Sequence, residues 1–168
     1  GKRHRGRRLF LATAAMSAGF SASAAADPQA LEAFAAYCFN PLMTAERAAE
    51  VLPARHDFYD LDPFRSGTEI SPPQGRAATQ GTDRRCEVAF DGEAVEAARD
   101  TVISALDREG ILTEADVPPD FPAQDGAAFV AARQLNPNRI AVVQVGTRPR
   151  PSGPETFFHV DRLVPLED

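Results

Sequence analysis

The first 26 residues decide which part of this chain folds and where, because they have the pattern of a cleaved export signal. Five basic residues and no acidic residue come first, and an apolar, alanine-rich run follows from Leu9 to Ala22. Ala24-Ala25-Ala26 then supplies the small residues of a signal-peptidase site. We therefore expect residues 1–26 to be removed by cleavage after Ala26, and residues 27–168 to form a single exported domain.

The basic region resembles a known class of export signal. Arg7-Arg8-Leu9-Phe10-Leu11 matches the twin-arginine pattern of two arginines, any residue, then Phe-Leu. Gly6 and Ala12 depart from that pattern, which usually has Ser or Thr and Lys there. An arginine-rich signal for the ordinary Sec route is therefore the alternative. Either signal implies a bacterial protein that is periplasmic or secreted, and the twin-arginine resemblance implies a route that carries folded, often cofactor-loaded proteins.

A membrane anchor is the competing interpretation of the same apolar run. Residues 9–26 contain far more alanine than leucine or isoleucine, and their length is at the lower limit for crossing a bilayer. No cysteine directly follows Ala26, so the pattern does not indicate a lipoprotein. No later stretch is apolar enough to cross a membrane. We expect a soluble domain with no stable membrane insertion after cleavage.

The charge of the remaining chain limits its partners. The first 26 residues hold five of the 18 Lys and Arg and none of the 24 Asp and Glu. Residues 27–168 therefore carry 13 basic against 24 acidic residues, a formal charge of −11. Nucleic acid and anionic membranes repel such a domain. We expect an unidentified protein or a small molecule as its partner, and no nucleic acid.

Two cysteines, Cys38 and Cys86, occur in a chain with an oxidising destination. An even count in an exported protein predicts a disulfide, and two separate buried thiols are the alternative. The bond would close a loop of about 49 residues, which stabilises the fold by roughly 4 kcal/mol in the chain-entropy model.

Hydrophobic periodicity, caps and turn residues predict an α+β domain. We expect an antiparallel sheet of about four to six strands, two or three helices packed on one of its faces, and one disulfide. Asp27 and Thr44 are expected to cap the first two helices, and Asp91 the third. The predicted elements are helices near 28–38, 44–52 and 91–109, a weak hairpin over 68–80, and strands over 84–90, 127–135, 140–147 and 155–164.

His159 and Asp161 are the candidate catalytic residues. They are spaced to share one face of the last predicted strand, and a histidine oriented by a carboxylate is a potential general base. The alternative is a half-exposed strand face with no catalytic role, because alternate strand residues project in parallel without necessarily bonding.

Two further clusters are candidates for binding. Asp57, Asp60 and Asp62 offer carboxylates to a hard cation such as Ca²⁺, although their spacing does not match an EF-hand. Arg148 and Arg150 project from a proline-rich turn and are candidates for an anion or partner site. In both clusters, solvated surface charge is the alternative.

Several reaction classes lack their motifs in this chain. It has no Cys-x-x-Cys, no Gly-x-Ser-x-Gly, no phosphate loop and no dinucleotide fingerprint. We therefore expect no cofactor and favour a non-enzymatic binding or interaction domain. The alternatives are a periplasmic hydrolase that uses His159 and Asp161, and a carrier of a small ligand or metal.

Overall fold

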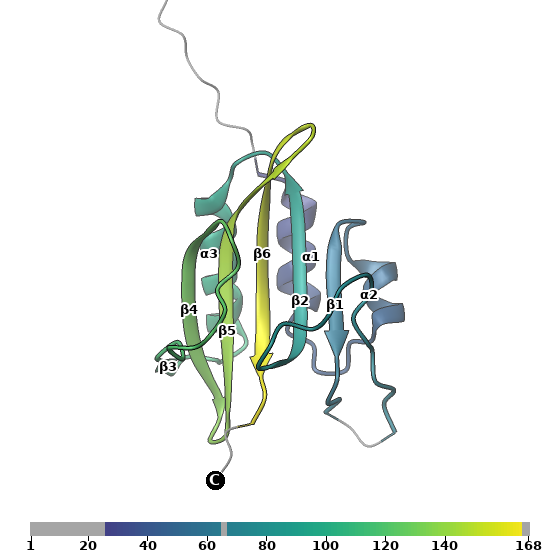
Figure 1. The fold of residues 1–168 in the computed structure, drawn as a ribbon, viewed down its shortest axis with the longest axis vertical. Coiled ribbons are helices and arrows are strands. Elements are labelled where there is room, and N and C mark those ends of the chain that lie inside the picture. The colour runs from purple at the N-terminus through teal and green to yellow at the C-terminus, as the bar shows by residue number, and fades with distance from the viewer. Residues whose placement is uncertain (1–25, 65–66, 166–168) are drawn as a thin grey trace, which may run out of the picture.

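The computed structural model describes residues 26–64 and 67–165 and contains three helices and one antiparallel sheet of six strands (Figure 1). The predicted α+β class is therefore confirmed. The expected export signal, apart from Ala26, lies outside the described residues. The elements are α1 (Pro28–Tyr37), α2 (Ala45–Val51), β1 (His56–Asp60), β2 (Thr82–Asp91), α3 (Val95–Arg108), β3 (Glu114–Ala115), β4 (Ala127–Asn136), β5 (Arg139–Arg150) and β6 (Gly153–Leu163).

The strand order is β1-β2-β6-β5-β4-β3, and every neighbouring pair is antiparallel. β6 lies in the middle, between β2 and β5, although it follows both of them in the chain. Cys86 pairs with Val160, and Val160 in turn pairs with Val143. This register aligns the apolar residues of the three central strands on one face.

Two of the three predicted helix caps are confirmed. The Asp27 carboxylate accepts from the backbone N–H of Gln29 at 3.0 Å, and the Thr44 hydroxyl accepts from that of Arg47 at 3.2 Å. The prediction that Asp91 caps α3 is wrong. Asp91 is the last residue of β2, and α3 starts from Ala94, whose N–H donates to the Thr156 hydroxyl on β6 at 3.0 Å.

The segment between α2 and β2 also differs from the prediction. His56–Asp60, for which no strand was predicted, forms strand β1 at the edge of the sheet. The hairpin expected over residues 68–80 is not present among the described residues of that range, which contain one isolated bridge, from Ser71 to Asp60. Proline and glycine residues in this range favour turns over a regular ladder.

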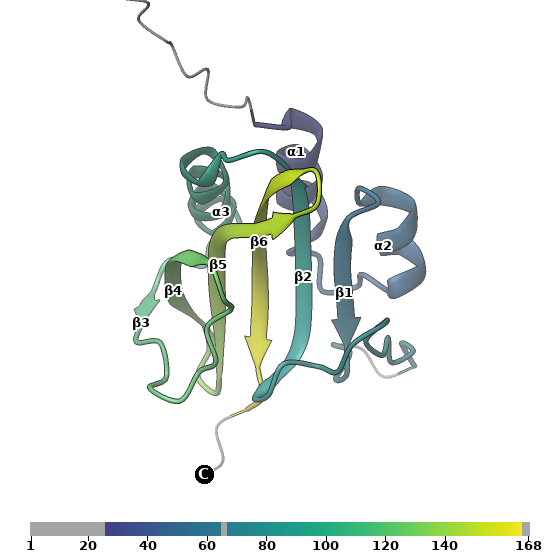
Figure 2. The same cartoon turned by 45° about the horizontal axis from the view of Figure 1, so that its top comes forward.

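The three helices cover one face of the sheet and enclose the main core (Figure 2). The Phe34 ring of α1 lies 4.8 Å from the Phe158 ring of β6, between ring centres. Phe158 in turn contacts Phe90 of β2 edge to face at 5.9 Å. Among the described residues, no helix is both long and apolar enough to cross a bilayer.

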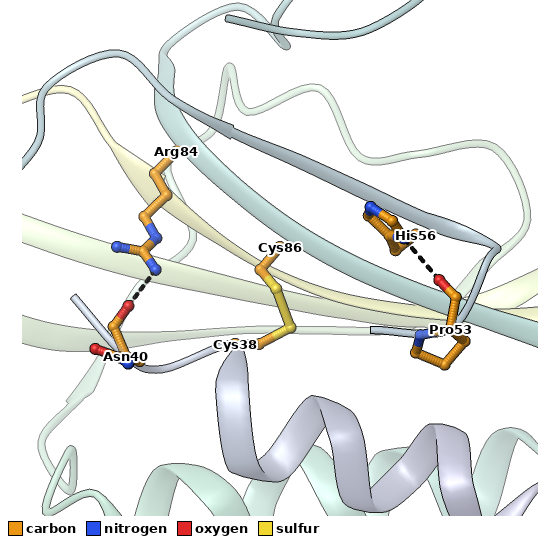
Figure 3. The surroundings of a disulfide bond; sticks show 6 residues. All are labelled: Cys38, Asn40, Pro53, His56, Arg84 and Cys86. Carbon is orange, nitrogen blue, oxygen red and sulfur yellow. Dashed lines mark hydrogen bonds between the residues drawn. A yellow bond between two sulfur atoms is a disulfide. The ribbon is translucent and has the colours of Figure 1, made fainter. Parts of the chain in front are cut away.

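The predicted disulfide is present and joins the end of α1 to the central strand β2 (Figure 3). The Cα atoms of Cys38 and Cys86 are 5.4 Å apart, and both side chains are buried in the main core. Two residues beyond Cys38, the Asn40 carbonyl accepts a hydrogen bond from Arg84 of β2 at 2.6 Å. The disulfide therefore fixes how α1 docks on the sheet.

The opposite face of the sheet is covered by coil, and we call it the covered face. Residues 72–81 pass in front of β1, and residues 116–126, the wall segment, pass in front of β5 (Figures 1 and 2). The N–H of Thr79 donates to the Tyr59 hydroxyl at 3.1 Å, and the N–H of Gln124 donates to the Gln144 side chain at 2.8 Å. These two contacts anchor the coil segments to the sheet.

Candidate functional site

The covered face carries charged side chains in the interior of the protein. Arg85 and Glu87 of β2 lie directly opposite Asp161 and His159 of β6, respectively. All four residues are at most 4% exposed. Burial of charge is costly unless each group has a partner, so the partners decide what these residues do.

Arg85 and Asp161 form a two-point ion pair across the two strands. Arg85 Nε donates to Asp161 Oδ1 at 2.7 Å, and Nη2 donates to Oδ2 at 2.6 Å. Burial would lower the pKa of Arg85, but the hydrogen bonds and charge of Asp161 raise it above its usual value. Both planar groups are therefore fully engaged with each other.

Glu87 forms the second pair, with His159. Further ion pairs then connect Glu87 through Arg148 and Glu155 to Arg55. His159 Nδ1 donates to Glu87 Oε2 at 3.0 Å, and Arg148 Nη2 donates to Glu87 Oε1 at 2.7 Å. Arg148 also donates to Glu155 at 3.2 Å, and Arg55 donates to Glu155 at 3.0 Å. Burial would raise the pKa of Glu87, but the bonds and charges of His159 and Arg148 lower it to about 2.

The depressed pKa of Glu87 predicts a specific loss of stability in acid. A carboxyl whose pKa is lower in the folded than in the unfolded chain stabilises the fold above its unfolded pKa of 4.5. That contribution disappears as the pH falls from about 4.5 towards about 2. We expect the free energy of unfolding to fall in this window by roughly 3 kcal/mol more in the wild type than in Glu87→Gln. Urea unfolding followed by circular dichroism at each pH measures the difference.

Glu50→Gln is the matched control, because Glu50 pairs with Arg47 on the exposed surface of α2. Its curve should run parallel to that of the wild type, since exposed pairs contribute little. Parallel curves for Glu87→Gln and the wild type would show that Glu87 does not titrate differently in the folded chain.

His159 and Asp161 share the covered face, as their spacing predicts, but they have different partners. His159 bonds to Glu87 and Asp161 bonds to Arg85, so Asp161 does not orient the imidazole. His159 is fully buried, and its Nε2 has no hydrogen-bond partner among the described residues. The nitrogen that would act as a general base is therefore enclosed.

The three candidate metal ligands lie on or just after β1, and arginines from other elements bind each of them. Asp57 accepts from Arg76, and Asp62 accepts from Arg139. Asp60 is buried and accepts from Arg84 at 3.3 Å and from Arg162 at 2.9 Å. Within residues 26–64 and 67–165, no group of three or more His, Cys, Asp or Glu is arranged to hold a metal ion.

Arg148 and Arg150 differ in their positions on β5. Arg148 folds back over the covered face, where its guanidinium lies 4.7 Å from the centre of the Phe157 ring and is bonded to Glu87 and Glu155. Arg150 is exposed at the end of the strand. Arg148 is thus committed to internal partners, and the partner site predicted for the two residues stays a prediction.

A groove of about 470 Å³ opens on the covered face between its two coil segments. Gln80 and Gly81 form one side, and the wall segment forms the other. The ends of β5 and β6 supply the floor, through Ile140 and Leu163. This volume lies in the range of pockets that hold small organic molecules. The full lining is Gln80, Gly81, Pro118, Asp120, Phe121, Pro122, Ile140, Leu163, Val164 and Pro165.

The wall segment is held in place at both ends. At its start, Val117 packs with Phe121 against Val142 and Leu163 of the sheet. At its end, the Gly126 carbonyl accepts from the Thr147 N–H, and Gly146 lies so close that a Cβ there would meet Gly126 O at 2.2 Å. The groove is therefore bounded by a fixed segment.

Sequence reasoning missed Glu87 and the groove for different reasons. The signal for Glu87 was its alternation with Arg85 in a strand that also carries Val88 and Phe90 on the other face. His159 and Asp161 have the same spacing on β6. Once β2 and β6 are known to pair, Glu87 is a partner for His159 and Arg85 is a partner for Asp161. The groove left no such signal, because its sides are coil segments distant in the chain.

No protein family, no curated protein and no solved structure matches this chain.

Proposed function

We propose that this chain is an exported, non-enzymatic binding domain that acts in the bacterial periplasm or outside the cell. The export-signal pattern of residues 1–26 supports the location, and the Cys38–Cys86 disulfide is consistent with an oxidising compartment. The observation that carries the binding role is the groove between Gln80 and Phe121. It is concave, mostly apolar and open to solvent, which are the usual properties of a small-ligand site.

The buried ion pairs give the alternative, a hydrolase, less support. A general base must come within hydrogen-bond reach of the proton that it removes. His159 and Asp161 are both fully buried and are bonded to Glu87 and Arg85. In our proposal these four residues stabilise the sheet, and the groove acts without them.

Native mass spectrometry of the full chain, recovered from the exported fraction of its bacterial host, tests this proposal. We expect a polypeptide that begins at Asp27, is lighter by two hydrogens than the reduced chain, and carries a non-covalent companion of constant mass. Gln80→Trp, which places a large ring at the groove, should remove that companion. Gln29→Trp, an exposed position on α1, should retain it.

Hydrolysis of an activated ester such as p-nitrophenyl butyrate provides the opposing test. The proposal requires the rate with wild-type protein to equal the rate with a His159→Gln variant that remains folded. The hydrolase would be favoured by two results together. These are a wild-type protein without a companion mass, and an esterase activity that His159→Gln abolishes. A mass that still includes residues 1–26 would contradict the cleavage.

A further inference from the structure

The groove on the covered face has an uneven distribution of charge. Of the described residues that line it, only Asp120 is ionisable. The segment that supplies Asp120, residues 113–126, also contains Glu114, Asp116 and Asp125 outside the lining, and it contains no basic residue. An apolar floor thus lies beside a side that carries only negative charge.

These four carboxylates have no ion-pair partner within residues 26–64 and 67–165. The arginines that flank the groove floor in sequence, Arg139 and Arg162, are bonded to Asp83 at 2.6 and 2.7 Å. Neither arginine is therefore paired with Asp120, whose carboxylate forms no ion pair among the described residues.

The floor selects for an apolar body. Phe121 and Pro122 on one side, with Ile140, Leu163 and Val164 below, offer carbon surface to a ligand. Leu163 and Ile140 belong to a small apolar cluster with Val142, so this surface has a fixed backing. Burial of apolar surface supplies affinity, and a charge at the edge supplies selectivity.

We propose that the groove binds small amphiphilic cations, molecules with an apolar body and a protonated amine that lies against Asp120. This inference rests on the proposed binding function and specifies its ligand. The volume of about 470 Å³ sets the size at one small organic molecule. The charge of Asp120 sets the sign, since an anion of equal apolar size would meet this carboxylate.

Isothermal titration with two probes of equal chain length and opposite charge, octylammonium and octanoate, tests the proposal below their micelle concentrations. We expect the full chain to bind octylammonium on the order of tenfold more tightly than octanoate. A partly screened charge pair between the ammonium group and Asp120 contributes about this much affinity. Asp120→Lys should abolish or reverse this preference. Asp100→Lys changes the net charge equally on exposed α3 and should preserve it.

Amide chemical shifts locate the binding site. Octylammonium should shift the amide signals of the non-proline residues that line the groove, and the signals of α2 should stay unchanged; these lining residues are Gln80, Gly81, Asp120, Phe121, Ile140, Leu163 and Val164. Equal affinity for the two probes, or a preference that Asp120→Lys leaves intact, would overturn the inference.

If Gln80→Trp removes a native companion but octylammonium does not bind, the ligand class is wrong and the binding function stands. If octylammonium binds but the esterase activity depends on His159, the ligand class stands and the non-enzymatic part of the proposed function fails.

Discussion

Replacing Asp161 with alanine should lower the free energy of unfolding by about 3–5 kcal/mol, the cost of leaving one member of a buried ion pair alone. Arg85 is 2% exposed, and Asp161 accepts two hydrogen bonds from its guanidinium. The variant retains a buried positive charge whose partner is gone. Total stabilities of natural domains are of similar size, so much of the variant should unfold at modest urea concentrations. Urea unfolding followed by circular dichroism measures the loss.

A second variant keeps this expectation testable even if the first does not fold. Arg85→Met combined with Asp161→Leu removes both charges and fills the space with apolar atoms, which is often neutral or stabilising. We expect this double variant to be within about 1 kcal/mol of the wild type or above it. Glu50→Ala breaks an exposed pair and should cost under about 1 kcal/mol. An Asp161→Ala cost as small as that of Glu50→Ala would show that water reaches Arg85.

Loss of the disulfide is the second large effect that we expect. Cys38→Ala combined with Cys86→Ala should lower the free energy of unfolding by about 4 kcal/mol, because the unfolded chain regains the freedom of a long loop. The cysteines are 48 positions apart, and the bond fastens α1 to the central part of the sheet. Alanine is preferred to serine here, since both positions are buried and a hydroxyl would need a partner.

Reduction provides the matched comparison for the disulfide. Wild-type protein unfolded in urea with a thiol reductant should lose about the same free energy as the double variant. The double variant itself should not respond to the reductant. A wild type whose unfolding curve is the same with and without reductant, under conditions where mass spectrometry shows the thiols free, would mean that the bond does not stabilise α1 on the sheet.

The caps show which parts of the fold follow from local sequence. Asp27 and Thr44 bond to N–H groups two or three residues ahead, so a short sequence window contains both partners. The start of α3 depends on Thr156, which is 62 residues from Ala94. Asp91, the residue that the local pattern favoured, pairs instead with Arg55 at 2.7 Å. A cap supplied by a distant strand leaves no local signal.

Strand β1 was missed because both of its faces are buried. Phe58 points into the main core, and Tyr59 lies on the covered face, where its hydroxyl accepts from Thr79. A strand buried on both sides lacks the alternation of polar and apolar residues that marks half-exposed strands. The acidic residues of the same stretch then suggested a cation site, whereas their partners are arginines from β2, β5, β6 and the coil before β2.

The candidate site was only partly predictable for a related reason. Composition identified the net acidic charge of the domain, and strand spacing placed His159 and Asp161 on one face. Neither observation reveals that the wall segment and residues 80–81 face each other across the ends of β5 and β6. That arrangement depends on tertiary anchors, such as the bond from Gln124 to Gln144.

The central place of β6 has a consequence for the order in which this protein is made. β6 follows every other strand of the described sheet in the chain, yet it supplies the neighbours of both β2 and β5. Until Gly153–Leu163 leaves the ribosome, β1 with β2 and β3 with β4 and β5 are two separate pieces, each with an open edge. Such long-range pairing slows folding, and open edges invite pairing with other chains. A nascent chain of this topology therefore stays a substrate for chaperones until β6 has been made.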